Sequence, residues 1–216
     1  MTAVVSDLEG TLTTGESWRA FGDFVKAHGR RLAYALFFYT HLPGALAARA
    51  GLINAQRYRE LWFKNMTWVM RGLPAAEVEA LSAYIADALW QARRASVVAE
   101  LEAWRAQGAR LLIASGAYQR VVELFAERLG AEAVGTPLAF DAQGRATGRL
   151  NGPVSTGQTK AACVRAWLGD DALVAAYGDT EGDIPMLSLA RQPVAVSPDA
   201  ALRAKALASG WRILER

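Results

Sequence analysis

Short apolar runs that alternate with helical patterns are the feature that most constrains how this 216-residue chain can fold. The apolar runs occupy residues 3–6, 110–114, 172–177 and 193–197, and each has the length of a buried strand. Helical patterns that separate or follow them span residues 96–107, 118–129, 159–168 and 199–209. Strands that alternate with helices are typical of βαβ units, so the sequence predicts an α/β fold with a mostly parallel sheet.

A long segment without convincing strands interrupts this alternation. Residues 13–95 show helical patterns at 17–27, 31–39, 54–70 and 75–92, with expected breaks at Pro43-Gly44 and at Gly72-Leu73-Pro74. We therefore expect a core domain made of residues 1–12 and 96–216, and a helical domain of residues 13–95 inserted after the first strand. Residues 136–151 predict two short strands around a turn at Gln143-Gly144.

The predicted insertion differs in chemistry from the rest of the chain. It carries 11 basic and 6 acidic residues and 13 of the 20 aromatic residues. These aromatic side chains either pack the insertion's own small core or form a surface for an anionic, partly apolar ligand. Residues 32–48 lack charged side chains, but Pro43-Gly44 and His41 argue against a membrane-spanning helix. A buried helix or hairpin tip is expected there, with peripheral membrane contact as the alternative.

Several classes of protein are disfavoured by composition. The single cysteine, Cys163, excludes a disulfide framework and a multi-cysteine zinc site. The net charge of +3 is modest, and no basic run is long enough to predict nucleic-acid binding. The first residues lack the pattern of a signal peptide, so a cytoplasmic location is expected. The sequence does not predict the oligomeric state.

Four carboxylates carry the predicted chemistry. Asp7 and Glu9 follow the first strand, whereas Asp179 and Asp183 follow the strand at residues 172–177. Ligands of parallel sheets bind outside the carboxyl ends of the strands, which is where both pairs fall. If the two strands are neighbours, the mutual repulsion of these carboxylates requires a cation, and oxygen ligands favour Mg²⁺.

Three further residues are expected at the same edge of the sheet. Ser115 and the Gly116 amide stand at a strand end before a helix, which is a common anion site. Lys160, one of only four lysines, begins another helix and has the charge to neutralise a phosphoryl oxygen. Each feature alone has a simpler explanation: a carboxylate at a strand end is often a helix cap, Ser-Gly is commonly a turn, and a single lysine is usually a solvated surface residue. The specific signal is that they occur together, in order, at one end of successive strands.

These motifs resemble those of the haloacid dehalogenase-like (HAD) hydrolase superfamily. The segment Asp7-Leu-Glu-Gly-Thr-Leu is similar to its first motif, Ser115-Gly116 to its second, Lys160 to its third, and the run from Gly178 to Asp183 to its fourth. The helical insertion and the hairpin at Gln143-Gly144 are similar to the phosphoserine phosphatase-like branch, which carries a helical C1 cap. The resemblance implies a Rossmann-like three-layer core under that cap.

The resemblance also implies phosphoryl transfer through an aspartyl-phosphate. Asp7 is then the nucleophile and Glu9 the general acid and base. The implied Mg²⁺ ligands are Asp7, the Glu9 carbonyl, Asp179 and Asp183. The implied contacts to the transferring phosphoryl group are Thr11, Ser115, Gly116 and Lys160.

The sequence departs from the family pattern at positions that bear on the substrate. Glu9 stands where aspartate is common, which retains the acid/base group and raises the option of transfer to an alcohol. Glu16 matches the amine-binding glutamate of phosphoserine phosphatases, but Met66 and Gly182 replace an arginine and an asparagine of their substrate site. Phosphoserine is therefore not favoured, and Glu16 is as well explained by a local ion pair.

The leading interpretation is a Mg²⁺-dependent phosphatase that acts on a small-molecule phosphomonoester. An amphiphilic or lipid phosphate, such as a lysophospholipid or phosphatidylglycerol phosphate, suits the aromatic residues at 37–39, Trp62, Phe63 and Trp68. Two alternatives remain open: a phosphotransferase with an alcohol acceptor, and a catalytically silent binding protein with the HAD fold.

Overall fold

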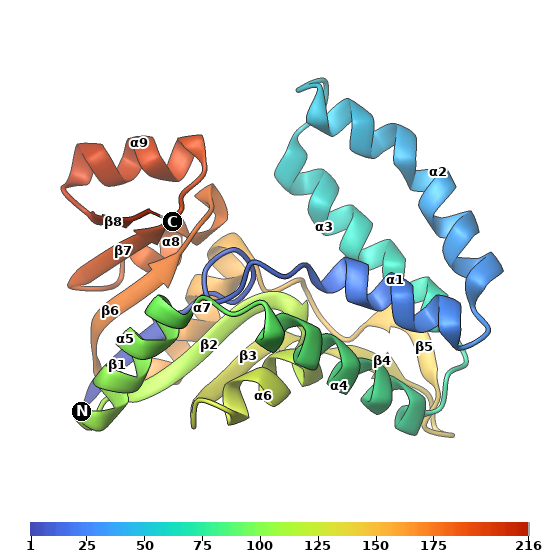
Figure 1. Cartoon of the computed structure of the whole chain (residues 1–216), viewed down its shortest axis with the longest axis horizontal. Coiled ribbons are helices and arrows are strands. Elements are labelled where there is room, and N and C mark those ends of the chain that lie inside the picture. Colours follow the sequence, from blue (N-terminus) through green and yellow to red (C-terminus); the bar gives the residue numbers. More distant parts are fainter. Residues whose placement is uncertain (216) are drawn as a thin grey trace.

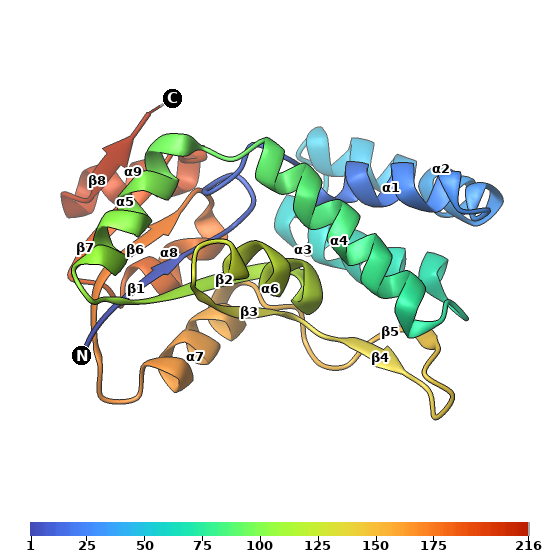
Figure 2. The same cartoon turned by 60° about the horizontal axis from the view of Figure 1, so that its bottom comes forward.

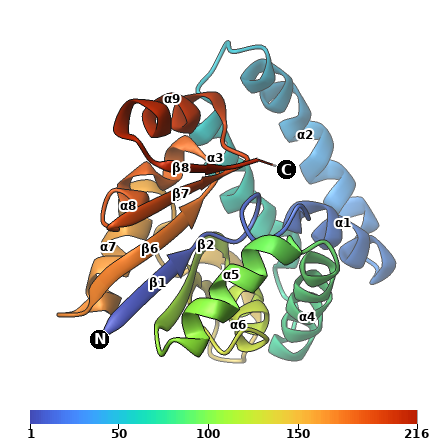
Figure 3. The same ribbon diagram turned by 60° about the vertical axis from the view of Figure 1, so that its left-hand side comes forward.

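The computed structural model describes residues 1–215 and contains a six-stranded parallel sheet (Figure 1). This confirms the predicted α/β fold with a parallel sheet, in which the sequence predicted four of the six strands. Its strand order is β3-β2-β1-β6-β7-β8, and every neighbouring pair runs parallel (Figure 3). The strands are β1 (Thr2–Ser6), β2 (Arg110–Tyr118), β3 (Glu132–Thr136), β6 (Ala172–Gly178), β7 (Gln192–Val196) and β8 (Arg212–Leu214). The sequence did not predict β3 and β8, which are short strands at the two edges of the sheet and depend on pairing with β2 and β7.

Alternating side chains of the strands build two cores, one on each face of the sheet. Val4 packs with α5 (Ala95–Ala106) and α6 (Gln119–Glu127). Val5 packs with helices on the other face, which are α7 (Gly157–Leu168), α8 (Ile184–Leu187) and α9 (Ala200–Ser209). Figure 2 shows α5 and α7 on opposite sides of the sheet. The core therefore has the three expected layers.

The helical insertion leaves the sheet after β1 and returns before α5. It consists of α1 (Ser17–Ala27), α2 (Arg31–Arg49), α3 (Ala55–Met66), a 3₁₀ turn at Thr67–Met70, and α4 (Ala75–Gln91). The outgoing and returning segments lie side by side, because Thr14 N donates to Ala92 O at 3.0 Å and Arg94 N donates to Leu12 O at 2.7 Å. The domain division at residues 13–95 remains a prediction, and this double crossing supports it.

The expected end of α2 near Tyr39 is wrong, because the helix continues through Pro43 to Arg49. Packing against α3 explains the continuation. The Tyr58 hydroxyl of α3 donates to the His41 carbonyl, two residues before Pro43, and so ties this turn of α2 to α3. Gly44 leaves room for this ring, since a Cβ there would lie 2.3 Å from a Tyr58 ring carbon.

The short antiparallel hairpin of β4 (Leu138–Phe140) and β5 (Ala146–Leu150) confirms the two predicted strands. The hairpin is hydrogen-bonded to the segment of the insertion before α4. Gly72 N donates to Ala146 O and Ala146 N donates to Leu73 O, both at 2.8 Å. The Thr67 hydroxyl also donates to Gly148 O at 2.8 Å. The hairpin thereby fixes the segment that connects α3 to α4.

The insertion shares a hydrophobic core with the sheet. One continuous cluster of buried side chains runs from Val4 through Phe125 of α6 and Leu81 of α4 to Phe21 and Phe37. The hairpin of α2 and α3 extends beyond this core, away from the sheet (Figure 1). Within residues 1–215, no helix combines the length and the apolar character needed to cross a bilayer.

We expect Gly44→Ala to destabilise the protein by about 1–3 kcal/mol, because its methyl group would overlap the Tyr58 ring. Alanine is otherwise the better helix former, by about 1 kcal/mol. Urea unfolding of the single and double variants with Tyr58→Ala tests this cause. In the Tyr58→Ala background, Gly44→Ala should be neutral or stabilising, and an unchanged loss would contradict the steric explanation.

Candidate active site

The carboxyl ends of β1 and β6 bring three aspartates together. Asp7 follows β1, and its N–H donates to Tyr177 O of the neighbouring strand at 2.9 Å. Asp179 follows β6, and Asp183 ends the 3₁₀ turn that comes next, Glu181–Asp183. A carboxylate oxygen from each of the three lies within 4.8 Å of the others. The predicted convergence of these residues is therefore present.

Lys160 links two of the three aspartates. It lies in the first turns of α7, and its Nζ donates to Asp7 Oδ1 at 2.6 Å and to Asp183 Oδ1 at 2.7 Å. All three side chains are buried. The interpretation of Lys160 as a solvated surface residue is thereby excluded.

Burial and like charges perturb the acidity of this cluster. Burial raises the pKa of Asp7 to about 7, against the opposing effect of Lys160. Burial, together with the charges of Asp7 and Asp183, raises the pKa of Asp179 to about 8. Burial lowers the pKa of Lys160, but Asp183 and Asp7 outweigh it and hold that pKa above its ordinary value. The cluster thus carries an excess of negative charge that favours protons or a cation.

The donor set fits a divalent cation. Three carboxylates balanced by one ammonium group leave two uncompensated negative charges when all are ionised, and their oxygens are the ligands that hard cations prefer. The chain also leaves space around Asp179: Gly10 has a φ of +87°, and a Cβ there would lie 2.0 Å from Asp179 Oδ2. Thr11 donates to Asp179 Oδ1 at 3.1 Å, which orients that carboxylate.

Ser115 and Gly116 face the same cavity from β2, whose regular pairing with β3 is interrupted between Ala114 and Tyr118. Ser115 is buried, and its Oγ accepts a hydrogen bond from Ala117 N at 3.2 Å. Ser115 is also among the residues that line the cavity. A Cβ at Gly116 would lie 2.9 Å from the Thr156 side chain, so glycine allows this close approach.

Glu9 also lines the cavity, and Ser17 at the start of α1 holds its carboxylate. The Ser17 N–H donates to Glu9 Oε1, and the Ser17 hydroxyl donates to Oε2 at 3.1 Å. Burial raises the pKa of Glu9 despite these bonds. This role of Ser17 could not be predicted from the sequence, because a single serine at a helix start is usually only a cap.

The cavity above these residues has a volume of about 560 Å³ and extends between the core and the insertion. Its wall is largely apolar, with Trp18, Trp62, Phe63 and Met66 among the lining residues. The other aromatic residues singled out from the sequence, at 37–39 and Trp68, do not line it. Met66 lies in the cavity lining, and its role in substrate specificity stays a prediction.

Glu16 lies outside the cavity. Its side chain is exposed and pairs with Arg19 one turn later on α1, which agrees with the local explanation.

Gln56 of α3 occupies the space that the missing side chain at position 182 leaves open. Its Nε2 lies 3.3 Å from where a Cβ of Gly182 would stand. Nearby, the Thr156 hydroxyl donates to Glu60 Oε1 at 2.6 Å, which joins the insertion to the first turn of α7. The sequence missed both contacts, because each pairs residues that are about 100 positions apart or more.

Comparisons with known proteins agree with this site. The model of the haloacid dehalogenase-like hydrolase family matches residues 4–188. Protein CicA of Caulobacter vibrioides is 31% identical over 194 residues, which cover 87% of this chain and 82% of that protein. Phosphoserine phosphatase SerB1 of Mycobacterium tuberculosis is 31% identical over 226 residues, covering 98% of this chain and 70% of that protein.

The chain belongs to the haloacid dehalogenase-like hydrolase family, and a phosphoserine phosphatase is among its relatives. Its fold is also that of a crystal structure of a Bordetella pertussis protein of unknown function. The two share 23% identity and a TM-score of 0.80 over 99% of this chain and 97% of the other. The acidic cluster and the family together indicate a divalent metal.

We expect Mg²⁺ to raise the melting temperature more at pH 8 than at pH 5.5. The pKa values of Asp7 and Asp179 are raised in the folded protein. Their contribution to the free energy of unfolding of the metal-free protein is therefore complete below the ordinary pKa of 3.8, and it is lost as pH rises through about 7 and about 8. The metal binds the deprotonated forms. At about 100 times its Kd, it should add roughly 5–10 °C at pH 8.

Thermal scans with Mg²⁺ and with a chelator, for the wild type and Asp179→Asn, provide the measurement. Equal shifts at the two pH values, or an undiminished shift in the variant, would contradict the assigned cation site.

Proposed function

We propose that the protein is a Mg²⁺-dependent phosphatase that hydrolyses an amphiphilic phosphomonoester through an aspartyl-phosphate on Asp7. The observation that carries the proposal is the buried Lys160 bridging Asp7 and Asp183 at the floor of an apolar cavity. A binding protein without catalysis gains nothing from burying these charges together, since their desolvation is costly.

In the first step, an Asp7 oxygen attacks phosphorus as the bond from phosphorus to the leaving oxygen breaks. The leaving alkoxide takes a proton from Glu9, whose raised pKa favours the protonated form that this step needs. In the second step, water attacks the aspartyl-phosphate and gives its proton to Glu9. Phosphate and the free Asp7 carboxylate result.

The surrounding groups hold the transferring phosphoryl group. Lys160 supplies positive charge next to Asp7, and the Ser115 hydroxyl and the Gly116 N–H are the proposed donors on the facing strand. Thr11 was predicted as a further phosphate contact. Its hydrogen bond to Asp179 supports a role in orienting that carboxylate.

Asp7, Asp179, Asp183 and the Glu9 carbonyl are the proposed ligands of Mg²⁺. When bound, this ion supplies charge that offsets the repulsion between the Asp7 carboxylate and an anionic substrate.

We expect Asp7→Asn to abolish phosphate release, and Glu9→Gln to slow it by about 10²–10⁴-fold because the acid and base are lost. Steady-state and burst measurements with a chromogenic aryl phosphate test both variants. Its good leaving group needs little acid assistance, so Glu9→Gln should still release aryl alcohol in a burst and accumulate phosphorylated protein.

Asp170→Asn, at an exposed aspartate outside the cavity, is the matched control and should behave as the wild type. Full activity in Asp7→Asn would remove Asp7 as the nucleophile. Alcohols that capture phosphate instead of water would identify a phosphotransferase. No turnover of any phosphomonoester by the wild type would support a silent binding protein.

The shape of the cavity supports the amphiphilic substrate. From Lys160 it extends past Trp62 and Met66 to Ala45 and Ala48 on α2. A phosphate at the Lys160 end leaves the rest of the substrate among apolar side chains. Phosphoserine would place its amine and carboxylate there, beside Met66, with Glu16 outside the cavity.

We expect kcat/KM to rise with the chain length of monomeric alkyl phosphates, by up to about fourfold per methylene buried against this wall. Ala48→Glu should flatten that dependence, because it places a charge on the wall. Ala47→Glu carries the same charge one residue away, outside the cavity lining, and is the control. A preference for phosphoserine over every alkyl phosphate would contradict the amphiphilic assignment.

A further inference from the structure

We propose that the outer face of α2 and the α2–α3 tip form a docking surface for bilayers that contain anionic lipid. The outer stripe of α2 consists of Leu32, Leu36, Tyr39, Pro43 and Leu46. Leu32, Leu36, Tyr39 and Leu46 are 86%, 57%, 71% and 58% exposed, and Leu52 at the tip is 78% exposed. Such a concentration of exposed large apolar side chains on one element marks an interaction surface.

The stripe has a helical repeat that makes it continuous. Its residues follow one another at intervals of four, three, four and three positions, so they share one side of the helix. The opposite side packs inward: Tyr34 and Phe37 are buried, and Phe37 contacts Trp62 of α3 at a ring distance of 5.0 Å. Packing within the chain therefore explains the inner face of α2, whereas no other helix or strand within residues 1–215 covers the outer stripe.

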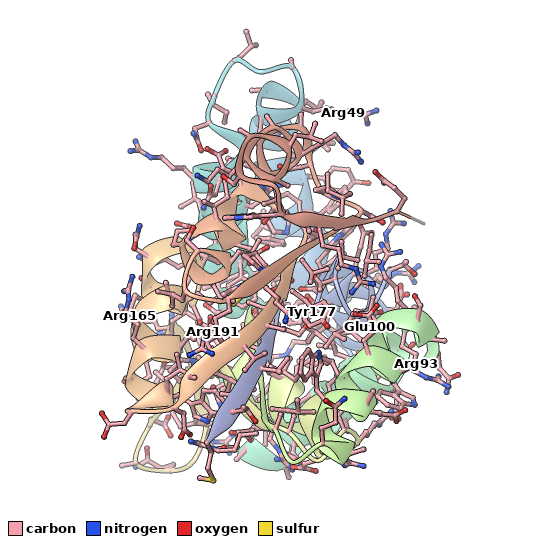
Figure 4. The ribbon with its side chains drawn as sticks, turned by 90° about the vertical axis from the view of Figure 1, so that its left-hand side faces the viewer. Arg49, Arg93, Glu100, Arg165, Tyr177 and Arg191 are labelled. Atoms are coloured by element: carbon pink, nitrogen blue, oxygen red, sulfur yellow. The ribbon has the colours of Figure 1, made fainter. Side chains whose placement is uncertain are left out.

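The charge around the stripe selects the kind of partner. Residues 24–59 contain six lysine and arginine residues and no acidic residue. Arg31, Arg49 and Arg57 are exposed and form no ion pair within residues 1–215. Figure 4 shows Arg49 at the hairpin end of the molecule, far from Arg165 and Arg191 on the core.

Cations that flank an apolar stripe complement anionic lipid headgroups over a hydrocarbon layer. A second copy of the chain, docked through the same stripe, would bring two such cationic segments together without a compensating acid. Charge complementarity therefore favours a lipid surface over self-association.

The catalytic cavity reaches the same hairpin. Its outer end is lined by Ala48 and Arg49 at the end of α2 and by Ala55 and Arg59 at the start of α3. Docking through the tip brings this end to the level of the lipid headgroups, so an amphiphilic substrate enters without crossing bulk water. This last step rests on the proposed function, whereas the docking itself does not.

Vesicle co-sedimentation with the full chain tests the docking. Vesicles of phosphatidylcholine, with and without phosphatidylglycerol, are compared at low and high NaCl. We expect binding to the mixed vesicles, a decrease with salt, and at least a roughly tenfold loss of binding in Leu32→Ser/Leu36→Ser/Tyr39→Ser.

The matched control is Tyr84→Ser/Phe140→Ser/Leu207→Ser, which removes three exposed large apolar side chains outside the hairpin. It should bind vesicles as the wild type does.

Three results would overturn the docking surface. The first is an absence of vesicle binding by the wild type, and the second is equal binding by the wild type and the stripe variant. The third is that sedimentation velocity shows a dimeric wild type without lipid affinity and a monomeric stripe variant. Turnover of a short soluble phosphomonoester is measured on the same samples. It reports, independently of vesicle binding, whether the protein is folded and the catalytic site intact. Lost vesicle binding with intact turnover supports the docking surface, and retained binding without wild-type turnover would count only against the proposed function.

Discussion

The ion pairs of Lys160 with Asp7 and Asp183 are the interaction on which the rest of the site depends. The two buried carboxylates of Asp7 and Asp183 and the half-buried carboxylate of Asp179 lie within 4.8 Å of one another and repel, and this one buried ammonium group removes part of that repulsion. The parallel pairing of β1 with β6 supplies two of the carboxylates, and α7 supplies the ammonium. The edge of the sheet therefore carries uncompensated negative charge, which a divalent cation would neutralise.

The part of the cavity that the insertion lines differs in chemistry from the part at the sheet edge. Its walls come from the insertion, where aromatic and apolar side chains face the cavity and the cations lie near its outer end. The carboxylates and Lys160 are thus gathered at the edge of the sheet, whereas α1, α2 and α3 supply the aromatic part of the lining. Under the proposed function, this separation would let one phosphoryl-transfer site serve leaving groups of very different polarity.

The positions of site residues that the sheet holds could be predicted from the sequence, whereas the positions of those that depend on the insertion were harder to predict. Asp7 and Asp179 could be placed together because the ends of neighbouring parallel strands share an edge. Gln56 and Ser17 could not, because their roles depend on how α3 and α1 lie over the core. The run at residues 37–39 shows the same limit: its composition left open a packed core or a surface, and in the structure Phe37 is buried whereas Tyr39 is exposed.

The continuous core from β1 to α2 has a consequence for how the molecule comes apart. Because Phe21 and Phe37 of the insertion belong to the same buried cluster as Val4 of the sheet, the two parts do not form separate cooperative units. Heating should therefore unfold both parts in one transition. A substitution that destabilises the insertion should lower the stability of the whole chain. Sequence changes in the helices of the insertion are therefore limited by the folding of the whole chain.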